Sequence, residues 1–227
     1  MMLLREKKTT FITSEKAIME KKFKVLIING SPREKGNIAL ALNEMKQVFD
    51  GLGVEYDYYQ LGKMDIRGCI ACETCRGTGK CVFNDIVNEL SSKFEESDGL
   101  VIASPVYYGS ANGTLMSALQ RMFYSTHFDK SLKVGASVVS ARRSGCTATF
   151  DELNKFFTLC NMPVATSQYW NNIYGWEPGE GSVDDEGRQV MRVLARNMVF
   201  LMRSIALGKE QIGLPDEEER VWTNFTR

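Results

Sequence analysis

The sequence lacks the features that mark several common classes of protein. Its 28 Lys and Arg residues are balanced by 28 Asp and Glu residues, so no net field attracts nucleic acid or an anionic membrane surface. No apolar run approaches the roughly 18 residues of a membrane-spanning helix, and the apolar stretch before Arg5 is too short for a signal peptide. We therefore expect a cytoplasmic protein with no nucleic-acid or membrane partner.

Histidine and cysteine are also scarce. His127 is the one histidine, so a Ser-His or Cys-His dyad would have to use it, and its place after a helix favours a capping or interface role. Six cysteines are too few for a disulfide scaffold, but four of them lie within thirteen residues. Such clustering indicates metal or redox chemistry.

The sequence does contain a regular alternation of strand and helix patterns. Lys24–Asn29 is a continuous apolar run typical of a strand buried on both faces, and helical spacing follows over Asn37–Gly51. Further strands are expected at 54–60, 99–103, 133–140 and 164–169, and further helices at 82–97, 113–124, 147–161 and 187–207. The alternation predicts an α/β fold with helices on both faces of a five-stranded parallel sheet.

The segments outside this alternation differ from the rest in composition. Residues 1–22 mix charged side chains with little periodicity and are expected to form a flexible extension, with Met19 as an alternative start to Met1. We expect one domain over 23–210 with a cysteine-rich insert at 67–82, followed by a charged tail over 211–227. A hydrophobic content of 44% supports one large core in that domain.

The loop after the first predicted strand is part of the expected ligand site, because ligands of open parallel sheets bind where strand order reverses. It lacks the Gly-x-Gly-x-x-Gly motif of dinucleotide-binding folds, and Asn37-Ile38 follows Gly36 where a nucleotide triphosphatase needs Lys-Ser or Lys-Thr. Ser31, Asn37 and the backbone N–H groups that open the helix favour a phosphate, and Arg33 can add a charged contact. Simple helix capping is the alternative for Ser31 or Asn37.

The loop after the third predicted strand, from Ser104 to Gly113, combines a proline, two tyrosines and several small residues. Such a loop can present backbone donors and an aromatic wall to a flat heteroaromatic ring. A phosphate site and a ring platform on neighbouring loops together indicate FMN. Core packing is the alternative for Tyr107 or Tyr108 taken singly.

These two loops resemble those of the NADPH-dependent FMN reductase family through Asn29-Gly30-Ser31-Pro32-Arg33 with Gly36-Asn37, and through Ser104-Pro105-Val106-Tyr107-Tyr108-Gly109. The resemblance covers about 24–207 and implies a flavodoxin-like three-layer sandwich. It also implies that the first loop holds the FMN phosphate and that the third and fourth loops contact the isoalloxazine. The residues implied to bind FMN are Ser31, Arg33, Gly36, Asn37, Ile38, Pro105, Val106, Tyr107, Tyr108, Gly109, Ser140, Arg142 and Gly145. For Arg142, simple surface charge is the alternative.

The most specific motif in the chain is Cys69-x-x-Cys72-x-x-Cys75-x5-Cys81. Three thiolates within seven residues can hold three corners of a cubane, and Gly77 and Gly79 let the chain curl so that Cys81 reaches the fourth. The spacing favours a [4Fe-4S] cluster. Zinc, which usually takes two separated Cys-x-x-Cys pairs, and free thiols without a metal are the alternatives. With the FMN reductase core, the motif resembles the iron-sulfur flavoproteins, which are homo-oligomeric electron-transfer proteins.

The resemblances imply an FMN-dependent oxidoreductase that exchanges electrons between a [4Fe-4S] cluster and FMN, with the cofactors rather than a protein acid or nucleophile carrying the chemistry. The expected partners are an electron donor such as NAD(P)H or ferredoxin, a small-molecule acceptor, and further copies in a homodimer or homotetramer. One alternative is a cluster-free NAD(P)H-dependent reductase of quinone, azo or nitro compounds. Another is a non-catalytic electron carrier.

Three further features have expected roles. The aromatic segment 169–176 is interpreted as a lid over the flavin or as a subunit interface. Cys160 is expected to pack in a helix, and Cys146 to belong to the flavin loop.

A response regulator of the same topology is disfavoured, because the sequence has Asn29-Gly30-Ser31 where that class needs an acidic pair.

Overall fold

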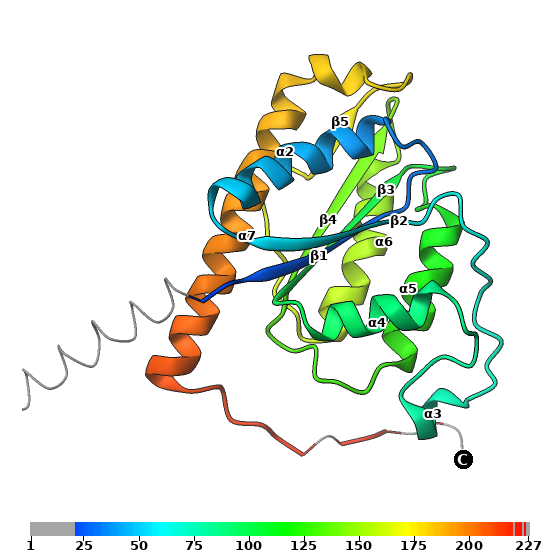
Figure 1. The fold of residues 1–227 in the computed structure, drawn as a ribbon, viewed down its shortest axis with the longest axis vertical. Coiled ribbons are helices and arrows are strands. Elements are labelled where there is room, and N and C mark those ends of the chain that lie inside the picture. The colour runs from blue at the N-terminus through cyan, green and yellow to red at the C-terminus, as the bar shows by residue number, and fades with distance from the viewer. Residues whose placement is uncertain (1–20, 220, 224, 226–227) are drawn as a thin grey trace, which may run out of the picture. The chain divides into compact units, whose positions relative to one another are not determined.

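Five parallel strands form a sheet in the order β2-β1-β3-β4-β5 (Figure 1). The computed structural model describes residues 21–219, 221–223 and 225. The strands are β1 (Lys24–Asn29), β2 (Glu55–Gln60), β3 (Gly99–Pro105), β4 (Val134–Ala141) and β5 (Asn172–Tyr174). The chain adds β2 on one side of β1 and then β3, β4 and β5 on the other, so strand order reverses between β1 and β3.

Helices cover both faces of the sheet. They are α2 (Asn37–Gly51), the short α3 (Cys75–Thr78), α4 (Ile86–Glu95), α5 (Gly113–Ser125), α6 (Cys146–Leu159) and α7 (Asp185–Ile212), with a 3₁₀ turn, η1, at Glu180–Val183. Figure 1 shows α2 and the part of α7 up to Met202 on one side of the sheet and α4, α5 and α6 on the other. The predicted α/β three-layer architecture is confirmed.

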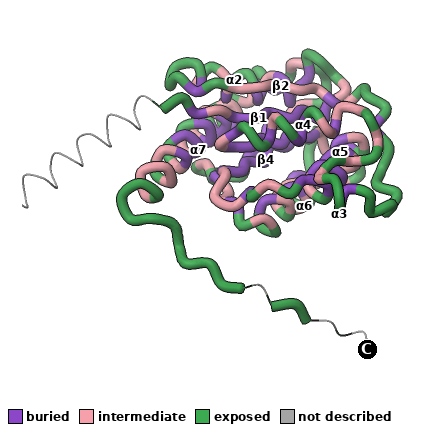
Figure 2. The backbone as a smooth tube through the Cα atoms, turned by 60° about the horizontal axis from the view of Figure 1, so that its bottom comes forward, coloured by how far each residue is buried: buried purple, intermediate pink, exposed green. Residues whose placement is uncertain are grey.

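The core follows from the alternation of side chains along the strands. In β1, Leu26 and Ile28 join a cluster that includes Phe94 of α4 and Leu119 of α5, all with no exposed surface. The intervening residues of β1 are equally buried, as expected for a strand covered on both faces (Figure 2). Burial of each such side chain contributes about 1.5–3 kcal/mol to the stability of the fold.

The prediction of a fifth strand at 164–169 is wrong. Val164 makes only an isolated bridge with Gly135 of β4, and the chain then leaves the sheet. Ser167 instead donates its hydroxyl to the Val190 carbonyl of α7 at 2.7 Å. Pairing with β4 resumes in the three residues of β5. The apolar run at 164 marks where the chain touches β4, but not where the paired strand lies.

The helix predicted at 82–97 begins later, at Ile86. Asp85 caps α4, because its side chain accepts the Val87 N–H at 3.1 Å. The short helix α3 within the cysteine segment was not expected, and the last helix extends beyond its predicted range at both ends, over Asp185–Ile212. The other predicted elements agree with the structure to within about two residues.

The chain divides into two units. Lys22–Met202 form one compact unit, and the residues described from Arg203 onward belong to the second. Of the extension predicted at 1–22, residues 1–20 lie outside the described part of the chain, and the domain boundary at 210 stays a prediction. Among the described residues, no helix has both the length and the apolar character needed to cross a membrane.

Candidate functional site

A cavity of about 350 Å³ lies at the carboxyl ends of the strands. Loops after β1, β3 and β4 line it together with the segment after β5. The residues predicted from sequence that line it are Ser31, Arg33, Gly36, Asn37, Ile38, Pro105, Val106, Tyr107, Ser140 and Arg142. Tyr108, Gly109 and Gly145 do not line the cavity. The fold therefore brings together most of a residue set that is dispersed over more than a hundred positions in the sequence.

The loop after β1 leads into α2 without a side-chain cap. Asn29 Oδ1 accepts the Ser31 N–H at 2.8 Å, and Ser31 Oγ accepts the Arg33 N–H at 3.1 Å. Gly36 is the N-cap of α2 and supplies no side chain to the first turn. The helix N-terminus thus presents uncapped backbone donors and the positive end of its dipole beside the cavity. This arrangement suits an anion such as a phosphate.

The Asn37 side chain lines the cavity and also holds the segment after β5. Its Oδ1 accepts the N–H groups of Gly179 and Gly181 at 3.1 and 3.0 Å, and its Nδ2 donates to the Glu177 carbonyl at 3.2 Å. These bonds fasten the segment after β5 to the start of α2. The backbone N–H of Asn37, in the first turn of α2, can still face an anion.

The loop after β3 makes a tight turn at the cavity wall. Tyr107 and Ser110 exchange both backbone hydrogen bonds, at 2.9 and 3.0 Å, across Tyr108 and Gly109. Both central residues have positive φ, 52° and 76°, as in the turns of two-residue hairpins. Tyr107 faces the cavity, whereas the Tyr108 side chain is fully exposed.

Gly109 and Gly145 lie where the loops after β3 and β4 meet. Gly145 adopts φ +91° at the N-cap of α6, and a Cβ there would lie 2.8 Å from Val106 Cγ1 and 3.1 Å from Gly109 Cα. The loops after β3 and β4 therefore approach so closely that only glycine fits between them.

Trp176 forms a wall of the cavity, and it belongs to the segment 169–176 that the sequence interprets as a flavin lid or an interface. The Arg33 guanidinium donates to its carbonyl at 3.0 Å, and the Arg142 guanidinium lies 5.6 Å from its ring centroid. Glu180 accepts the Trp176 N–H at 2.7 Å. Arg33 thus holds the backbone of Trp176 and Arg142 contacts its ring, which gives Arg142 a structural role beyond surface charge.

The other aromatic residues of this segment do not line the cavity. Tyr169 and Trp170 pack against each other at 5.3 Å between ring centroids and are each more than half exposed. Tyr174 lies on β5 next to Cys146, the first residue of α6. Burial raises the pKa of Cys146, and its hydrogen bond with Tyr174 only partly offsets this. Cys146 is therefore a buried thiol beneath the loop after β4.

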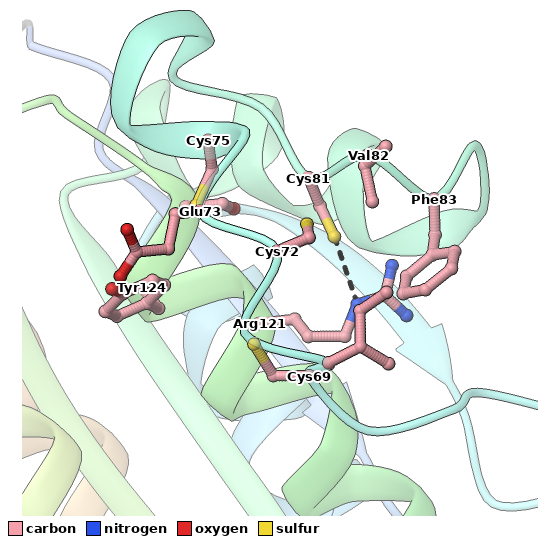
Figure 3. Close-up of a pocket in the computed structure, with 11 residues that line it drawn as sticks. Cys69, Cys72, Glu73, Cys75, Cys81, Val82, Phe83, Arg121 and Tyr124 are labelled. Carbon is pink, nitrogen blue, oxygen red and sulfur yellow. Dashed lines mark hydrogen bonds between the residues drawn. The ribbon is translucent and has the colours of Figure 1, made fainter.

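The four clustered cysteines line a second, smaller hollow (Figure 3). Ile70, Val82 and Phe83 form apolar walls around it, with Tyr124 from α5. The loop curls through left-handed backbone at Ala71, Glu73 and Gly79, with φ between 52° and 66°. Gly79 adopts the left-handed backbone, whereas Gly77 lies within α3. That these glycines bring Cys81 to a cluster stays a prediction.

The donor set of this hollow fits an iron-sulfur cluster. Its four cysteines are free thiols, and Cys75 is buried while Cys69 and Cys72 are exposed. Hydrogen bonds from Thr74 lower the pKa of Cys72, which favours the thiolate that a metal requires. The enclosed space is only about 20 Å³, and among the described residues no group of three or more His, Cys, Asp or Glu is placed to hold a metal ion. The cysteine set therefore has the chemistry for a cluster, but the described side chains are not arranged around a metal in this structure.

A third hollow, of about 540 Å³, lies beside the cysteine loop. Phe123 of α5 and Phe156 and Leu159 of α6 give it an apolar lining, and it shares Cys69 and Tyr124 with the cysteine hollow. Cys160, the C-cap of α6, also lines it and packs partly against the core, as predicted for a helix-packing residue.

His127 lies against the cysteine loop. A Cβ built on Gly79 would be 3.4 Å from its Nδ1. His127 lies two residues after the end of α5 at Ser125, so its predicted position after a helix is confirmed.

The model of the NADPH-dependent FMN reductase family matches residues 23–177 of this chain. That range contains the loops after β1, β3 and β4, the cysteine loop and Trp176. The chain belongs to the NADPH-dependent FMN reductase family. It is therefore a flavin-dependent oxidoreductase or electron-transfer protein.

Similar proteins of known name extend the comparison. An iron-sulfur flavoprotein of Methanocaldococcus jannaschii is 30% identical over 190 residues, which cover 80% of this chain and 98% of that protein. An iron-sulfur flavoprotein of Methanosarcina thermophila is 26% identical, over 83% of this chain and all of that protein. The crystal structure of RosB with a bound riboflavin-5'-phosphate derivative aligns with a TM-score of 0.63 at 15% identity, over 90% of this chain and 92% of that one. This last likeness shows the flavodoxin-like fold.

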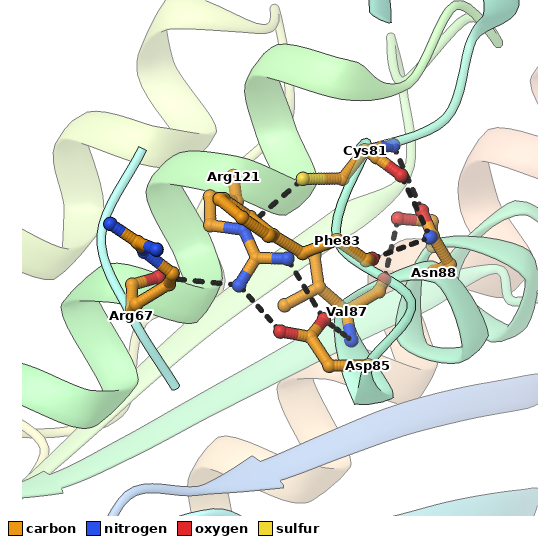
Figure 4. A network of polar contacts seen from close by, with 8 residues as sticks. Arg67, Cys81, Phe83, Asp85, Val87, Asn88 and Arg121 are labelled. Atoms are coloured by element: carbon orange, nitrogen blue, oxygen red, sulfur yellow. Dashed lines mark hydrogen bonds and ion pairs between the residues drawn. The ribbon is translucent and has the colours of Figure 1, made fainter. Parts of the chain in front are cut away.

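One charged network of this FMN reductase family member was not predicted from sequence (Figure 4). Arg121 of α5 is 1% exposed and bonds both Cys81 and Asp85. Burial lowers the pKa of Arg121, but its hydrogen bonds to Asp85 and Cys81 outweigh that effect and raise it overall. A signal was available, because Arg121 falls at helical spacing with the buried Ala118, Met122 and Ser125, where a charge is unusual.

Proposed function

We propose that this chain binds FMN in the cavity at the strand ends and a [4Fe-4S] cluster on its four clustered cysteines, and that it exchanges electrons between the two. The observation that carries the FMN site is the convergence on one cavity of an uncapped helix N-terminus and an aromatic-walled loop. When bound, FMN supplies chemistry in one- or two-electron steps, and an iron-sulfur cluster supplies single electrons.

The residues at the start of α2 would hold the FMN phosphate. Ser31 Oγ and the N–H groups after Gly36 would donate hydrogen bonds, and the Arg33 guanidinium would add charge. Arg33 already bonds the Trp176 carbonyl through one nitrogen, so its orientation is fixed before the ligand arrives. A donor that is already oriented loses less freedom when it binds.

Two aromatic side chains would enclose the isoalloxazine. Tyr107 and Trp176 line the same cavity from different loops, and both are partly exposed. The turn at Tyr108 and Gly109 fixes Tyr107, and the cation–π contact with Arg142 steadies Trp176. Their roles would be to position the ring and to exclude water from one part of it.

The cysteines would provide four thiolates to the cluster. Cys75 would be the buried ligand, whereas Cys69 and Cys72 are exposed and so accessible to incoming iron. The similarity to iron-sulfur flavoproteins supports this assignment. NAD(P)H or ferredoxin would supply the electrons, a small molecule would accept them, and the chain would act as a homodimer or homotetramer.

Chemical analysis after anaerobic expression with iron and sulfide tests this proposal. We expect about four irons and four sulfides per chain, together with bound FMN. An iron-free protein that reduces quinone, azo or nitro compounds with NAD(P)H would favour the cluster-free reductase. A flavin that cycles with ferredoxin while no small acceptor turns over would favour an electron carrier.

A further inference from the structure

Arg121 occupies an unusual place for an arginine. It lies on α5 with 1% of its surface exposed and at the edge of the cysteine hollow (Figure 3). Burial of an unpaired guanidinium would cost several kcal/mol, so its partners must compensate the charge.

Each part of the guanidinium has a partner (Figure 4). Nε donates to Cys81 Sγ at 3.2 Å, and Nη1 also reaches the Arg67 carbonyl at 3.2 Å. Nη1 and Nη2 donate to the two oxygens of Asp85 at 2.7 and 2.8 Å, in a bidentate pair. The Phe83 ring covers one side at 4.8 Å. The contacts with the Arg67 carbonyl, the Asp85 carboxylate and the Phe83 ring therefore fix the orientation in which Nε–H donates to the Cys81 sulfur.

The backbone of Cys81 is held as firmly as its side chain. Asn88 Oδ1 accepts the Cys81 N–H at 2.9 Å, and Asn88 Nδ2 donates to the Cys81 carbonyl at 3.0 Å. The same amide nitrogen donates to the Phe83 carbonyl at 3.0 Å. Both Asn88 and its neighbour Asp85 belong to the start of α4, so one helix end and one arginine define the position of Cys81.

We propose that Arg121 is a positioning residue for the iron-sulfur site, which orients Cys81 as a ligand and raises the reduction potential of the cluster through its charge and its N–H···S bond. This inference rests on the proposed function, because it requires that the four cysteines bind a cluster. A cluster with four thiolates becomes more negative on reduction, and hydrogen bonds to sulfur and nearby positive charge favour that reduced form.

Asp85 should have the opposite effect to Arg121 on the reduction potential of the cluster. Its carboxylate pairs with the guanidinium and so reduces the positive charge that a cluster would experience. Substitution of Asp85 by Asn preserves a good N-cap for α4 and the size of the side chain while removing the negative charge. Removing the charge of Arg121 and removing the charge of Asp85 should therefore shift the reduction potential of the cluster in opposite directions. A merely structural role for the network would not produce opposite shifts.

Anaerobic redox titration of the cluster, followed by electron paramagnetic resonance, tests this inference on the reconstituted full chain. We expect Arg121→Met to lower the midpoint potential and Asp85→Asn to raise it. Arg121→Lys keeps the charge but loses the Nε–H bond to Cys81, so we expect a smaller fall. Arg192→Met breaks an ion pair with Glu44 on the opposite face of the sheet and serves as the control with an unchanged potential.

FMN affinity measured on each variant separates misfolding from a local effect. If Arg121→Met holds no iron but binds FMN as the wild type does, the ligand-orienting role is supported, and Arg121→Lys then tests the potential. Potentials equal to wild type in both Arg121→Met and Asp85→Asn would overturn the inference, as would shifts of the same sign. A wild-type chain that takes up no iron would instead overturn the cluster in the proposed function.

Discussion

Arg33 is the residue whose charge the proposed FMN site depends on most. Its guanidinium lines the strand-end cavity and is anchored on the Trp176 carbonyl. Removal of one charge-assisted hydrogen bond costs about 1–2 kcal/mol, so we expect Arg33→Ala to raise the Kd for FMN about 5- to 30-fold.

Quenching of flavin fluorescence during a titration measures this change. Arg143→Ala is the matched control, because Arg143 is an exposed neighbour of Arg142 that does not line the cavity. Equal affinity in Arg33→Ala and wild type would mean that the guanidinium only supports Trp176.

Cys75 is the buried member of the cysteine set. Its substitution tests whether the two proposed cofactor sites are independent. We expect Cys75→Ser to lose the cluster and retain FMN, because no residue lines both the cysteine hollow and the strand-end cavity. Iron and flavin content measured after reconstitution provide the readout. Cys160→Ser, a cysteine outside the hollow, should retain both. Loss of FMN together with iron from a folded Cys75→Ser protein would contradict two separate sites.

Much of the site was predictable because its residues follow buried strands directly. Ser31 and Pro105 lie at strand ends, and parallel strands bring such positions to one edge of a sheet. The sequence predicts Trp176 only as one member of an aromatic lid or interface over 169–176, and it does not place Arg121 in the site. Their roles depend on contacts with Arg33, Arg142 and Cys81, which are far from them in the chain.

At the scale of elements, the loops after β3 and β4 meet through glycine. Gly145 has φ +91° and leaves no room for a Cβ beside Val106. We expect Gly145→Ala to reduce the free energy of unfolding by about 1–3 kcal/mol and to weaken FMN binding, since both loops must shift. Chemical denaturation measures the first effect. Gly113→Ala is the control, because a Cβ there meets nothing within 4 Å. Equal losses in the two variants would argue against this close approach.

The ion pairs between α2 and α7 should make stability depend on pH. Glu44 is 7% exposed and accepts from Arg188 at 2.7 Å and Arg192 at 2.6 Å. Burial raises the pKa of Glu44, but the two hydrogen bonds lower it by more than burial raises it. The pKa in the folded protein therefore lies below the ordinary 4.5. The stabilisation is therefore present above about pH 4.5 and is lost as the pH falls through the folded pKa.

We expect Glu44→Gln to lose about 1–3 kcal/mol of stability at pH 7, with the difference from wild type narrowing below pH 4.5. Urea denaturation at several pH values measures it. Glu34→Gln breaks an exposed pair with Lys63 and should change stability by less than about 1 kcal/mol. A pH-independent difference in Glu44→Gln would contradict the ion-pair explanation.

The fold was predictable where each element has its own pattern. β1 and α2 have the predicted bounds, because a continuous apolar run and helical spacing are local signals. The fifth strand was misplaced because β4 is paired in two steps, at Val164 and again over Asn172–Tyr174. The detour between them depends on bonds to α7, such as the one from Ser167 to Val190, which no local pattern encodes.

In the compact unit Lys22–Met202, loops that follow the strands of one sheet form two hollows with different chemistry. The strand-end cavity offers an uncapped helix, an arginine and aromatic walls, whereas the cysteine hollow offers sulfur ligands and a compensated buried charge. The reversal of strand order places the first beside β1 and β3, and the insertion after β2 forms the second. The family supplies a flavin core, and the cysteine loop adds a second redox site in our proposal.

Titration of the flavin-free, fully matured chain with FMN tests the central claim most directly. We predict one saturable site per chain, with strong quenching of flavin fluorescence and a Kd that rises in Arg33→Ala. A chain that carries no flavin after maturation and leaves the fluorescence of added FMN unchanged would contradict the account, whatever its iron content.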